Sequence, residues 1–410
     1  MNDRMWVEDL MLNKLGKLGK TENGYQRIAY GDADWEGRRM LAAEMERMGM
    51  SVRYDSVGNI IARFEGTDPD APAVASGSHS DTVPNGGTYD GSVGVIGAMC
   101  AMRRIHEKGP TKRPLEIWVF AGHESSRFGF NHLGSKSMTG LSQPERWANR
   151  KDIYGETVES VLASRGYDIH RAADAERAPG DVYSFIEMHI EQGPILEANH
   201  LKIGIVTDIA APIRFIVKLN GAASHSGTTP MDLRRDALVA AAKIILSVRR
   251  QCAKRMGDGI VGTVGRLTST PGAINCIPGY AELWIDVRGR DTDMIRETVA
   301  AIQEDSRAAA REEHVDISFD PISEASPVHL SERLGDLVEA SAKKLHVPCT
   351  RMVGGGGHDS ANIMRIAPTT VIHIPCRDGI SHAADEFCSI DDMMTGIDVL
   401  TDVIETLANE

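Results

Sequence analysis

The stretch PLEIWVFAGHE, residues 114–124, decides the fold and ends on two chemically active side chains. Its apolar run predicts a buried strand over 114–122, since short continuous apolar runs fill the interior strands of α/β sheets. His123 and Glu124 follow immediately. An imidazole and a carboxylate at the end of a buried strand indicate a functional site, because α/β sheets bind ligands at the carboxyl ends of their strands.

The segments around this strand alternate between strand and helix. A helix that joins two strands favours parallel pairing, so we expect an α/β fold with a mainly parallel sheet in the catalytic domain. His79, like Glu124, ends a predicted strand and belongs at the functional edge. The predicted elements are an amphipathic helix over 36–48, strands over 59–64 and 71–79, and a crossover helix over 93–109.

A compact α+β unit is predicted after residue 208. Residues 281–289 alternate apolar and polar side chains, which is typical of a strand with one buried face. Two amphipathic helices accompany an antiparallel-looking sheet in this part of the chain. The other predicted elements are strands over 213–221 and 315–320 and helices over 234–251 and 293–313.

The α/β pattern resumes beyond this unit. Residues 331–345 predict a helix with Ser331 as its N-cap, and 368–375 predict another buried strand. We therefore expect one domain to be inserted into another, each of ordinary size. The predicted boundaries are 1–210 and 327–410 for the catalytic domain, and 211–326 for the inserted domain.

Composition narrows the class of protein. The 410-residue chain has a formal net charge of -13, which argues against nucleic acid or an anionic membrane as a partner. None of its 6 cysteines forms a C-x-x-C pair, so neither a zinc knuckle nor a disulfide framework is predicted, and a reducing compartment fits. The charged start and the lack of an apolar run of about 18 residues argue against a signal peptide or membrane span. A cytoplasmic protein is expected.

Three histidines and two carboxylates lie at the ends of predicted elements. His79 and Asp90 fall in GSHSDTVPNGGTYDG, residues 77–91, whose glycines allow a close approach of the backbone. Taken alone, this pair is better explained by a loop histidine that bonds a neighbour. Together the five residues provide the ligands for two adjacent divalent ions, with one carboxylate bridging. They are His79, Asp90, Glu124, His189 and His382.

The sequence resembles the amidohydrolase branch of the M20 metallopeptidases, which includes N-carbamoyl-L-amino-acid hydrolases, β-ureidopropionases and allantoate amidohydrolases. The resemblance runs from about residue 30 to the end. It implies two zinc or manganese ions, with cobalt possible, and a homodimer whose inserted domain serves as lid and dimerisation domain. It rests on GSHSDTVPNGGTYDG, ESSRFGFNHLGS, HIEQGPILE, GAASHSGTTPMDLRRDAL, AINCIPGYAELWIDVRG, GGGGHDSANI and GISHAADE.

The resemblance also implies how the ligands divide. His79, Asp90 and His382 match the ligands of one metal. Asp90, Glu124 and His189 match those of the other, with Asp90 bridging. Asp81 matches the acid that orients His79, a role that physical reasoning supports, since carboxylates behind a ligating imidazole fix its orientation.

Other matched positions concern the substrate. The resemblance implies that Gln192 contacts it and that His225, often supplied by the partner subunit, stabilises the oxyanion. Arg288 suits a carboxylate because a guanidinium binds one bidentately. Each of these positions has an alternative explanation. Arg288 could form a surface ion pair, and His225 could be a turn histidine that bonds Thr228 or Thr229. The glycines around Gly356 could form only a flexible turn. The residues matched to the substrate carboxylate are Asn275, Arg288, Gly356 and His358.

The chain departs from the family pattern at His123. The family segment reads Glu-Glu-Gly-x-Arg-Phe, in which the first Glu is the general base and the second is a metal ligand. Here Arg127 and Phe128 align HESSRF, so Glu124 takes the ligand position and His123 the base position. Three hypotheses stay open. His123 is a working base, it stands aside or binds metal, or the protein has kept binding and lost hydrolysis.

These observations predict a metal-dependent hydrolase of a non-peptide C–N bond, of amide, ureido or amidine type. The substrate is expected to be a small molecule that carries a carboxylate. The resemblance implies attack by a metal-bridging hydroxide. Alternative activities on the same scaffold are a hydrolytic deaminase and an exopeptidase.

Overall fold

The computed structural model describes residues 2–410 and divides into two compact units. Unit 1 comprises residues 2–207, 330–352 and 358–410, and unit 2 comprises 208–329 and 353–357. Each unit has a hydrophobic core of its own. The residues predicted as an inserted domain, 211–326, all fall in unit 2.

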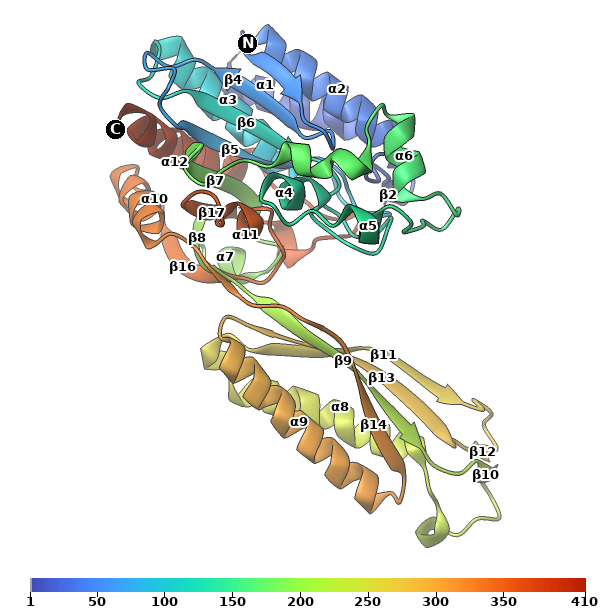
Figure 1. Ribbon diagram of the computed structural model, residues 1–410. Helices are drawn as coiled ribbons and strands as arrows, with labels where there is room; N and C mark the ends of the chain where they lie inside the picture. Colours follow the sequence, from blue (N-terminus) through green and yellow to red (C-terminus); the bar gives the residue numbers. More distant parts are fainter. Residues whose placement is uncertain (1) are drawn as a thin grey trace. The chain divides into compact units, whose positions relative to one another are not determined.

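A large mixed sheet forms the centre of unit 1 (Figure 1). Its strand order is β8-β17-β7-β5-β6-β4-β3, and β16 also pairs with β8. A small separate hairpin pairs β1 with β2. The strands are β1 (Lys20–Thr21), β2 (Gly24–Tyr25), β3 (Ser51–Tyr54), β4 (Ile60–Phe64), β5 (Ala73–His79), β6 (Leu115–Phe120), β7 (Val182–Ile190), β8 (Ile203–Ile209), β16 (Cys349–Gly354) and β17 (Thr369–Ile374).

The prediction of a mainly parallel sheet is only partly right. The four central strands β17, β7, β5 and β6 are parallel neighbours. On one side β4 and β3 are antiparallel additions, and on the other β8 runs antiparallel to β17. The strand predicted over 59–64 exists as β4, but a short apolar run carries no information on its direction.

The two faces of this sheet are buried by different helices. On β6, Leu115, Ile117 and Val119 join one hydrophobic cluster, whereas Trp118 and Phe120 join another, as the alternation of a strand requires. Helices α1, α2, α3, α10 and α12 pack on the first face, and α4 and α11 contact the second. The helices of unit 1 are α1 (Asp3–Glu8), α2 (Asp32–Arg47), α3 (Ser92–Lys108), α4 (Leu133–Met138), α5 (Pro144–Trp147), α6 (Val158–Ser164), α7 (Ile195–Ala198), α10 (Glu332–Lys344), α11 (Ser360–Ile363) and α12 (Ile390–Asn409).

Unit 2 is a four-stranded antiparallel sheet with two helices on one face (Figure 1). The sheet order is β11-β13-β9-β14, and the helices bury its apolar side in a single core. Two short pairs, β10 with β12 and β15 with the end of β8, complete it. The elements are β9 (Ala211–Asn220), β10 (Ser224–His225), α8 (Ala237–Lys254), β11 (Val261–Thr270), β12 (Cys276–Ile277), β13 (Tyr280–Gly289), α9 (Thr292–Glu312), β14 (Asp316–Glu324) and β15 (Val328–His329).

The helices of the described residues give no evidence of a membrane span. None of the helices in residues 2–410 combines the length and the apolar character needed to cross a bilayer.

Candidate metal centre

Strands β5 and β7 deliver two imidazoles to the same place. The two strands are parallel neighbours, so their carboxyl ends lie at one edge of the sheet. His79 is the last residue of β5, and His189 is the last but one of β7. Gly91, with φ 65°, lies against His79; a Cβ there would stand 2.4 Å from the imidazole, so a side chain would displace the ring.

Backbone carbonyls fix the tautomer of both imidazoles. The Nδ1 of His79 bonds the carbonyl oxygen of Asp81 at 3.0 Å, and the Nδ1 of His189 bonds that of Ile190 at 2.9 Å. Because a carbonyl oxygen only accepts, Nδ1 carries a proton, and in the neutral ring Nε2 keeps its lone pair. Neither Nε2 has a hydrogen-bond partner within residues 2–410, and neither does the buried Oε1 of Glu124. Buried donor and acceptor atoms of this kind call for a ligand.

Asp90 lies between two groups of donor atoms. Its Oδ1 is 3.1 Å from the Nε2 of His189 and 3.8 Å from that of His79. Its Oδ2 is 3.1 Å from the Nε2 of His382, which is 3.5 Å from the Oε1 of Glu124. Within each group the donor atoms lie within 4.8 Å of one another. The five residues predicted as ligands thus lie together, with Asp90 in both groups.

The structure groups the histidines differently from the predicted division. We expected His382 to join His79, and His189 to join Glu124. The structure places His189 beside His79, with ring centroids 5.8 Å apart, because β7 lies next to β5 in the sheet. The loop after β17 carries His382 to Glu124 instead. The two sets are His79, Asp90 and His189, and Asp90, Glu124 and His382.

Glu386 fastens the loops that carry two of these residues. Its Oε1 accepts hydrogen bonds from the backbone N–H groups of Tyr89 and Asp90, both at 3.0 Å. Its Oε2 accepts from the Ser381 hydroxyl at 2.8 Å and from the backbone N–H of His382 at 3.3 Å. One buried carboxylate therefore ties the Asp90 turn to the His382 turn, and it fixes the distance between them.

Burial and neighbouring charges shift the pKa values of the cluster. Burial raises the pKa of Glu124 to about 8, and Asp90 adds to the shift. The hydrogen bond to Asp90 raises the pKa of His382 to about 9. Burial lowers the pKa of His189, but Asp90 outweighs it and brings the value to about 9. Within residues 2–410, the ion pairs of Asp90 and Glu124 involve imidazoles alone, so neither carboxylate is paired with a lysine or an arginine.

This set of donors fits a pair of divalent cations. One group offers two imidazoles and a carboxylate, and the other offers one imidazole and two carboxylates. Nitrogen and oxygen donors in such numbers suit zinc, manganese or cobalt, and the shared Asp90 suits a bridging position. A bound cation would supply the partner that is missing at the Nε2 atoms of His79 and His189 and at the Oε1 of Glu124.

His123 lies beside this cluster and is held on three sides. Its ring stacks on that of His79, with centroids 3.6 Å apart and planes 4° from parallel, and it lies 4.6 Å from the ring of His132. Its Nδ1 is 2.7 Å from the Oδ2 of Asp359. Burial lowers the pKa of His123 to about 4, so the imidazole is neutral at pH 7. A neutral imidazole in a fixed orientation is able to accept a proton.

Asp81 acts differently from the expectation. We expected its carboxylate to orient His79, but the Oδ1 is 3.7 Å from that Nδ1, and the Asp81 carbonyl makes the hydrogen bond instead. The carboxylate accepts from the backbone N–H groups of His123 at 3.3 Å and Glu124 at 2.9 Å. Asp81 therefore supports both the ring of His79 and the backbone that carries the next two polar side chains.

Gln192 and His358 also contact the cluster. The Nε2 of Gln192 donates to Asp90 Oδ1 at 3.1 Å and is 3.3 Å from the Nε2 of His382. His358 is buried with its ring edge-on to His189 at 4.6 Å, and its Nε2 is 3.1 Å from the Nε2 of His373. Gln192 is therefore adjacent to the donor atoms, while His358 lies behind His189.

The other predicted substrate residues lie in unit 2. His225 is exposed, and its Nδ1 accepts from the Gly227 N–H at 3.1 Å, as in a turn; its bonds with Thr229 go through its carbonyl. Arg288 donates twice to Asp286, at 2.8 and 3.1 Å, and once to the carbonyl of Gly355 at 3.2 Å. Asn275 is exposed, and Gly356 follows the glycine that Arg288 contacts.

Sequence reasoning missed two residues that support the centre. Glu386 lies four positions after His382 and ends the segment GISHAADE, which supported the family resemblance as a whole. An acid so close to a predicted ligand could have indicated that Glu386 supports the site. Asp359 contacts His123 across 236 positions of sequence, and nothing local marks that contact. Long-range pairs of this kind depend on how α11 and the loop after β6 meet.

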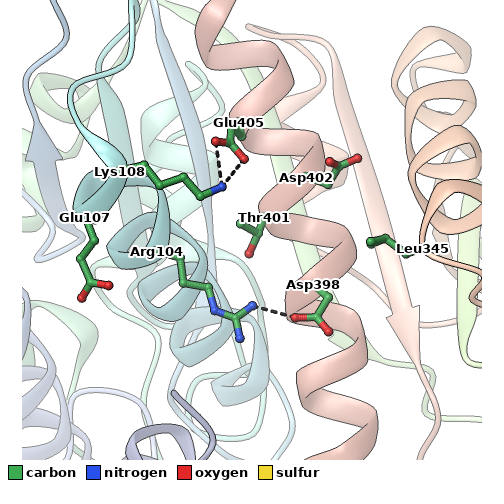
Figure 2. Close-up of a pocket in the computed structure, with 8 residues that line it drawn as sticks. All are labelled: Arg104, Glu107, Lys108, Leu345, Asp398, Thr401, Asp402 and Glu405. Atoms are coloured by element: carbon green, nitrogen blue, oxygen red, sulfur yellow. Dashed lines mark hydrogen bonds and ion pairs between the residues drawn. The ribbon is translucent and has the colours of Figure 1, made fainter. Parts of the chain in front are cut away.

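A charged hollow elsewhere in unit 1 has no part in this centre. It has a volume of about 500 Å³ and is lined mainly by side chains of α3 and α12 (Figure 2). Figure 2 shows Lys108 paired with Glu405, and Arg104 paired with Asp398. Its charges are thus matched within the protein, and none of the predicted site residues lines it.

Known proteins resemble this chain along nearly its whole length. Residues 75–406 match the model of peptidase family M20/M25/M40. The chain is 36% identical over 397 residues to an N-carbamoyl-L-amino-acid amidohydrolase of Pseudomonas sp. (strain NS671), which covers 96% of each chain. It is 38% identical over 383 residues to the ureidoglycolate hydrolase of Arabidopsis thaliana, covering 92% of this chain and 80% of the relative. The crystal structure of a hydantoinase/carbamoylase family amidase from Burkholderia multivorans superposes with a TM-score of 0.93 at 31% identity, covering 100% of this chain and 98% of that one.

Proposed function

The chain belongs to peptidase family M20/M25/M40, and from this premise we propose that it hydrolyses the ureido group of a small α-ureido carboxylate. The broader prediction, a hydrolase of C–N bonds other than peptide bonds, is confirmed by relatives that cover 96% and 92% of this chain. The family is metal-dependent, which agrees with the two groups of donor atoms around Asp90.

The substrate class follows from what the two relatives have in common. An N-carbamoyl-L-amino acid and ureidoglycolate both carry a ureido group on the carbon next to a carboxylate. They differ in the remaining substituent of that carbon. The shared part is what a common site must bind, so we take the α-ureido carboxylate as the recognised unit and leave the substituent open.

The observation that carries the proposal is the cluster of five donor residues that includes Asp90; four of them are buried, and His382 is exposed. Three atoms of the cluster, the Nε2 of His79, the Nε2 of His189 and the Oε1 of Glu124, have no hydrogen-bond partner among the described residues. A purely structural cluster would satisfy such atoms internally. A site that binds cations leaves them available.

Divalent cations bound there would polarise the ureido group and lower the pKa of a water molecule. Hydrolysis adds water to the ureido carbon, breaks its bond to the substrate nitrogen, and yields an amine, carbon dioxide and ammonia. His123 accepts the proton of the attacking water and passes it to the departing nitrogen, since its neutral imidazole adjoins the ligands. Asp81 holds the backbone of His123 and Glu124 in place.

Further roles rest on family membership. Gln192 contacts the substrate, and its position next to Asp90 and His382 supports this. The substrate carboxylate is bound by Arg288 and Asn275, together with Gly356 and His358. Two hydrogen bonds from Arg288 to Asp286 hold the guanidinium in one orientation. His225 stabilises the oxyanion. We also propose a zinc or manganese pair, unit 2 as the lid and dimerisation domain, a homodimer and a cytoplasmic location.

A panel of substrates tests the proposal. Metal-loaded protein is offered an N-carbamoyl-L-amino acid, ureidoglycolate, the matching N-acetyl amino acid, a dipeptide, and an alkylurea without a carboxylate. We expect ammonia and carbon dioxide from the first two alone, loss of turnover after chelation, and recovery with Zn²⁺ or Mn²⁺. Cleavage of the dipeptide would point to an exopeptidase, and ammonia without carbon dioxide would point to a deaminase.

A second candidate function is favoured by His123 itself. The family has a glutamate at this position, and an imidazole differs in shape and charge, so a protein that binds its ligand without hydrolysis is the alternative. The variant His123→Glu separates the two. Turnover by the wild type supports the hydrolase, whereas an inert wild type that gains turnover as His123→Glu supports the binding protein.

A further inference from the structure

A line of four buried side chains leads from α11 to His123. The amide Nδ2 of Asn362 donates to the Oγ of Ser135 at 2.9 Å. The Ser135 hydroxyl donates to the Oδ1 of Asp359, and the Oδ2 of Asp359 is 2.7 Å from the Nδ1 of His123. All four side chains belong to buried residues, and Ser135 and Asp359 are fully buried. They come from α4, α11 and the loop after β6.

The direction of these hydrogen bonds places the proton of the imidazole. An amide nitrogen only donates, so the Ser135 hydroxyl accepts from Asn362 and gives its own hydrogen to Asp359. An ionised Asp359 accepts at both of its oxygens, so the Nδ1 of His123, 2.7 Å from Oδ2, supplies the hydrogen for the second bond. The Nε2 of His123 is thereby left with its lone pair.

The ring of His123 is also fixed in orientation. It is parallel to His79 at 3.6 Å between centroids, and the ring of His132 lies against it at 4.6 Å. Two ring contacts and one charged hydrogen bond leave a single arrangement for the imidazole. His123 is therefore held beside a predicted ligand with its proton at a known atom.

We propose that Asp359 is a positioning residue that keeps the proton of His123 on Nδ1, so that Nε2 receives the proton of the attacking water. The proposal rests on the proposed function and adds to it a condition that a glutamate base does not have. A carboxylate has no tautomers, whereas an imidazole with its proton on the wrong nitrogen cannot accept at Nε2. Asp359 meets a requirement that His123 introduces.

The tautomer is measured directly by ¹⁵N NMR of protein labelled at histidine and free of metal. The His123 signals are those lost in His123→Gln. We expect Nδ1–H in the wild type. In Asp359→Asn we expect Nε2–H, because the Ser135 hydroxyl selects the amide oxygen and the amide N–H₂ then donates to Nδ1. The same tautomer in both proteins, or Nε2–H in the wild type, would overturn the proposal.

A control separates this effect from the loss of any acid that accepts a serine hydroxyl. Asp305 in unit 2 also accepts a hydrogen bond from a serine hydroxyl, that of Ser247. Asp305→Asn is expected to leave the His123 signals unchanged. The wild-type measurement needs no substitution, so it decides the position of the proton even if Asp359→Asn folds poorly.

Kinetics of the metal-loaded enzyme provide a second reading. We expect Asp359→Asn to lower kcat about 100-fold with little change in KM, which is the usual worth of a general base. In the His123→Glu background the same substitution is expected to change kcat less than about threefold, because no tautomer is left to control. Equal losses in both backgrounds would show a structural role and overturn the proposal.

The turnover assay and the ¹⁵N measurement test the proposed function and the role of Asp359 separately. A wild type that is inert toward every ureido carboxylate contradicts the proposed function. The ¹⁵N tautomer in the metal-free protein decides the role of Asp359 by itself.

Discussion

The two ends of strand β6 carry buried acids in opposite situations. Near its beginning, Glu116 accepts hydrogen bonds from Arg63 at 3.0 Å, Trp118 at 2.9 Å and Arg177 at 2.7 Å. Beyond its other end, Glu124 adjoins Asp90 and His382, and its Oε1 has no hydrogen-bond partner within residues 2–410. Burial raises a carboxyl pKa at both ends, but only the first end has guanidinium groups to offset it.

This difference separates structure from function within one strand. Burial tends to raise the pKa of Glu116, yet Arg177, Trp118 and Arg63 together keep it below its ordinary value. The pKa of Glu124 rises to about 8. A buried charge that the protein matches itself contributes to stability, whereas a set of donors left unmatched contributes to binding. Each of the following substitutions tests that distinction.

The largest effect is expected at the residue shared by both groups of donors. Asp90→Asn removes the carboxylate shared by both groups of donors, so each of the two proposed cations would lose a ligand, and turnover of an α-ureido carboxylate should fall at least about 1000-fold. Metal content by mass spectrometry should fall with it. Asp398→Asn, at an exposed acid of the charged hollow, is the control and should keep both. Full metal content and turnover in Asp90→Asn would show that the donors beyond the end of β6 do not bind metal, and the contrast with Glu116 would be lost.

At the other end of β6 the loss should appear in stability. Glu116→Gln breaks a buried ion-pair network and should lower the free energy of unfolding by about 3 kcal/mol at pH 7, measured by urea denaturation. Because the folded pKa of Glu116 is lowered, its contribution is complete above the unfolded value near 4.5 and disappears as the pH falls through the folded value. The difference between variant and wild type should therefore shrink in acid.

The control for this variant shares a partner with Glu116. Glu65 also pairs with Arg63, but its side chain is 62% exposed. Glu65→Gln should cost less than about 1 kcal/mol. A larger cost for Glu65→Gln than for Glu116→Gln would contradict the assignment of Glu116 to the fold.

A smaller effect is expected behind the ligands. Glu386→Gln weakens the bonds to the turns that carry Asp90 and His382, so metal affinity should fall about 10- to 100-fold, by calorimetric titration. Glu197→Gln is the matched control, because Glu197 binds the backbone of Asp378 in the same loop but contacts neither ligand. Unchanged affinity in Glu386→Gln would show that the two turns hold their distance without it.

The smallest effect is expected in the charged hollow. The pair of Lys108 with Glu405 is solvent-exposed, and Lys108→Gln should change the free energy of unfolding by less than about 1 kcal/mol and leave turnover as it is (Figure 2). A loss of turnover would give the hollow a function that its matched charges do not indicate.

Much of the fold could be read from local patterns. The strand predicted over 114–122 is β6 (Leu115–Phe120), the helix over 93–109 is α3 (Ser92–Lys108), and Ser331 caps α10 through the N–H of Leu334. Each of these depends on periodicity or on one capping side chain, and both are local properties. The direction of β4 and the order of β7 beside β5 depend on distant partners, and those could not be read.

The same limit applies to the candidate site. All five predicted ligands lie together, because each ends a strand or lies in a turn at one edge of the sheet. Their grouping in the structure differs from the predicted division, since it depends on which strand adjoins β5. Asp359 was missed because its contact with His123 joins α11 to the loop after β6. The sequence therefore indicated which residues belong to the site, but not which of them are neighbours in three dimensions.

We propose that the cluster around Asp90 binds two divalent cations. Crystals of the protein grown with Mn²⁺ and measured by anomalous diffraction test it most directly. We expect two peaks, one contacting His79, Asp90 and His189 and the other contacting Asp90, Glu124 and His382. An anomalous map with no peak among these five residues would contradict it.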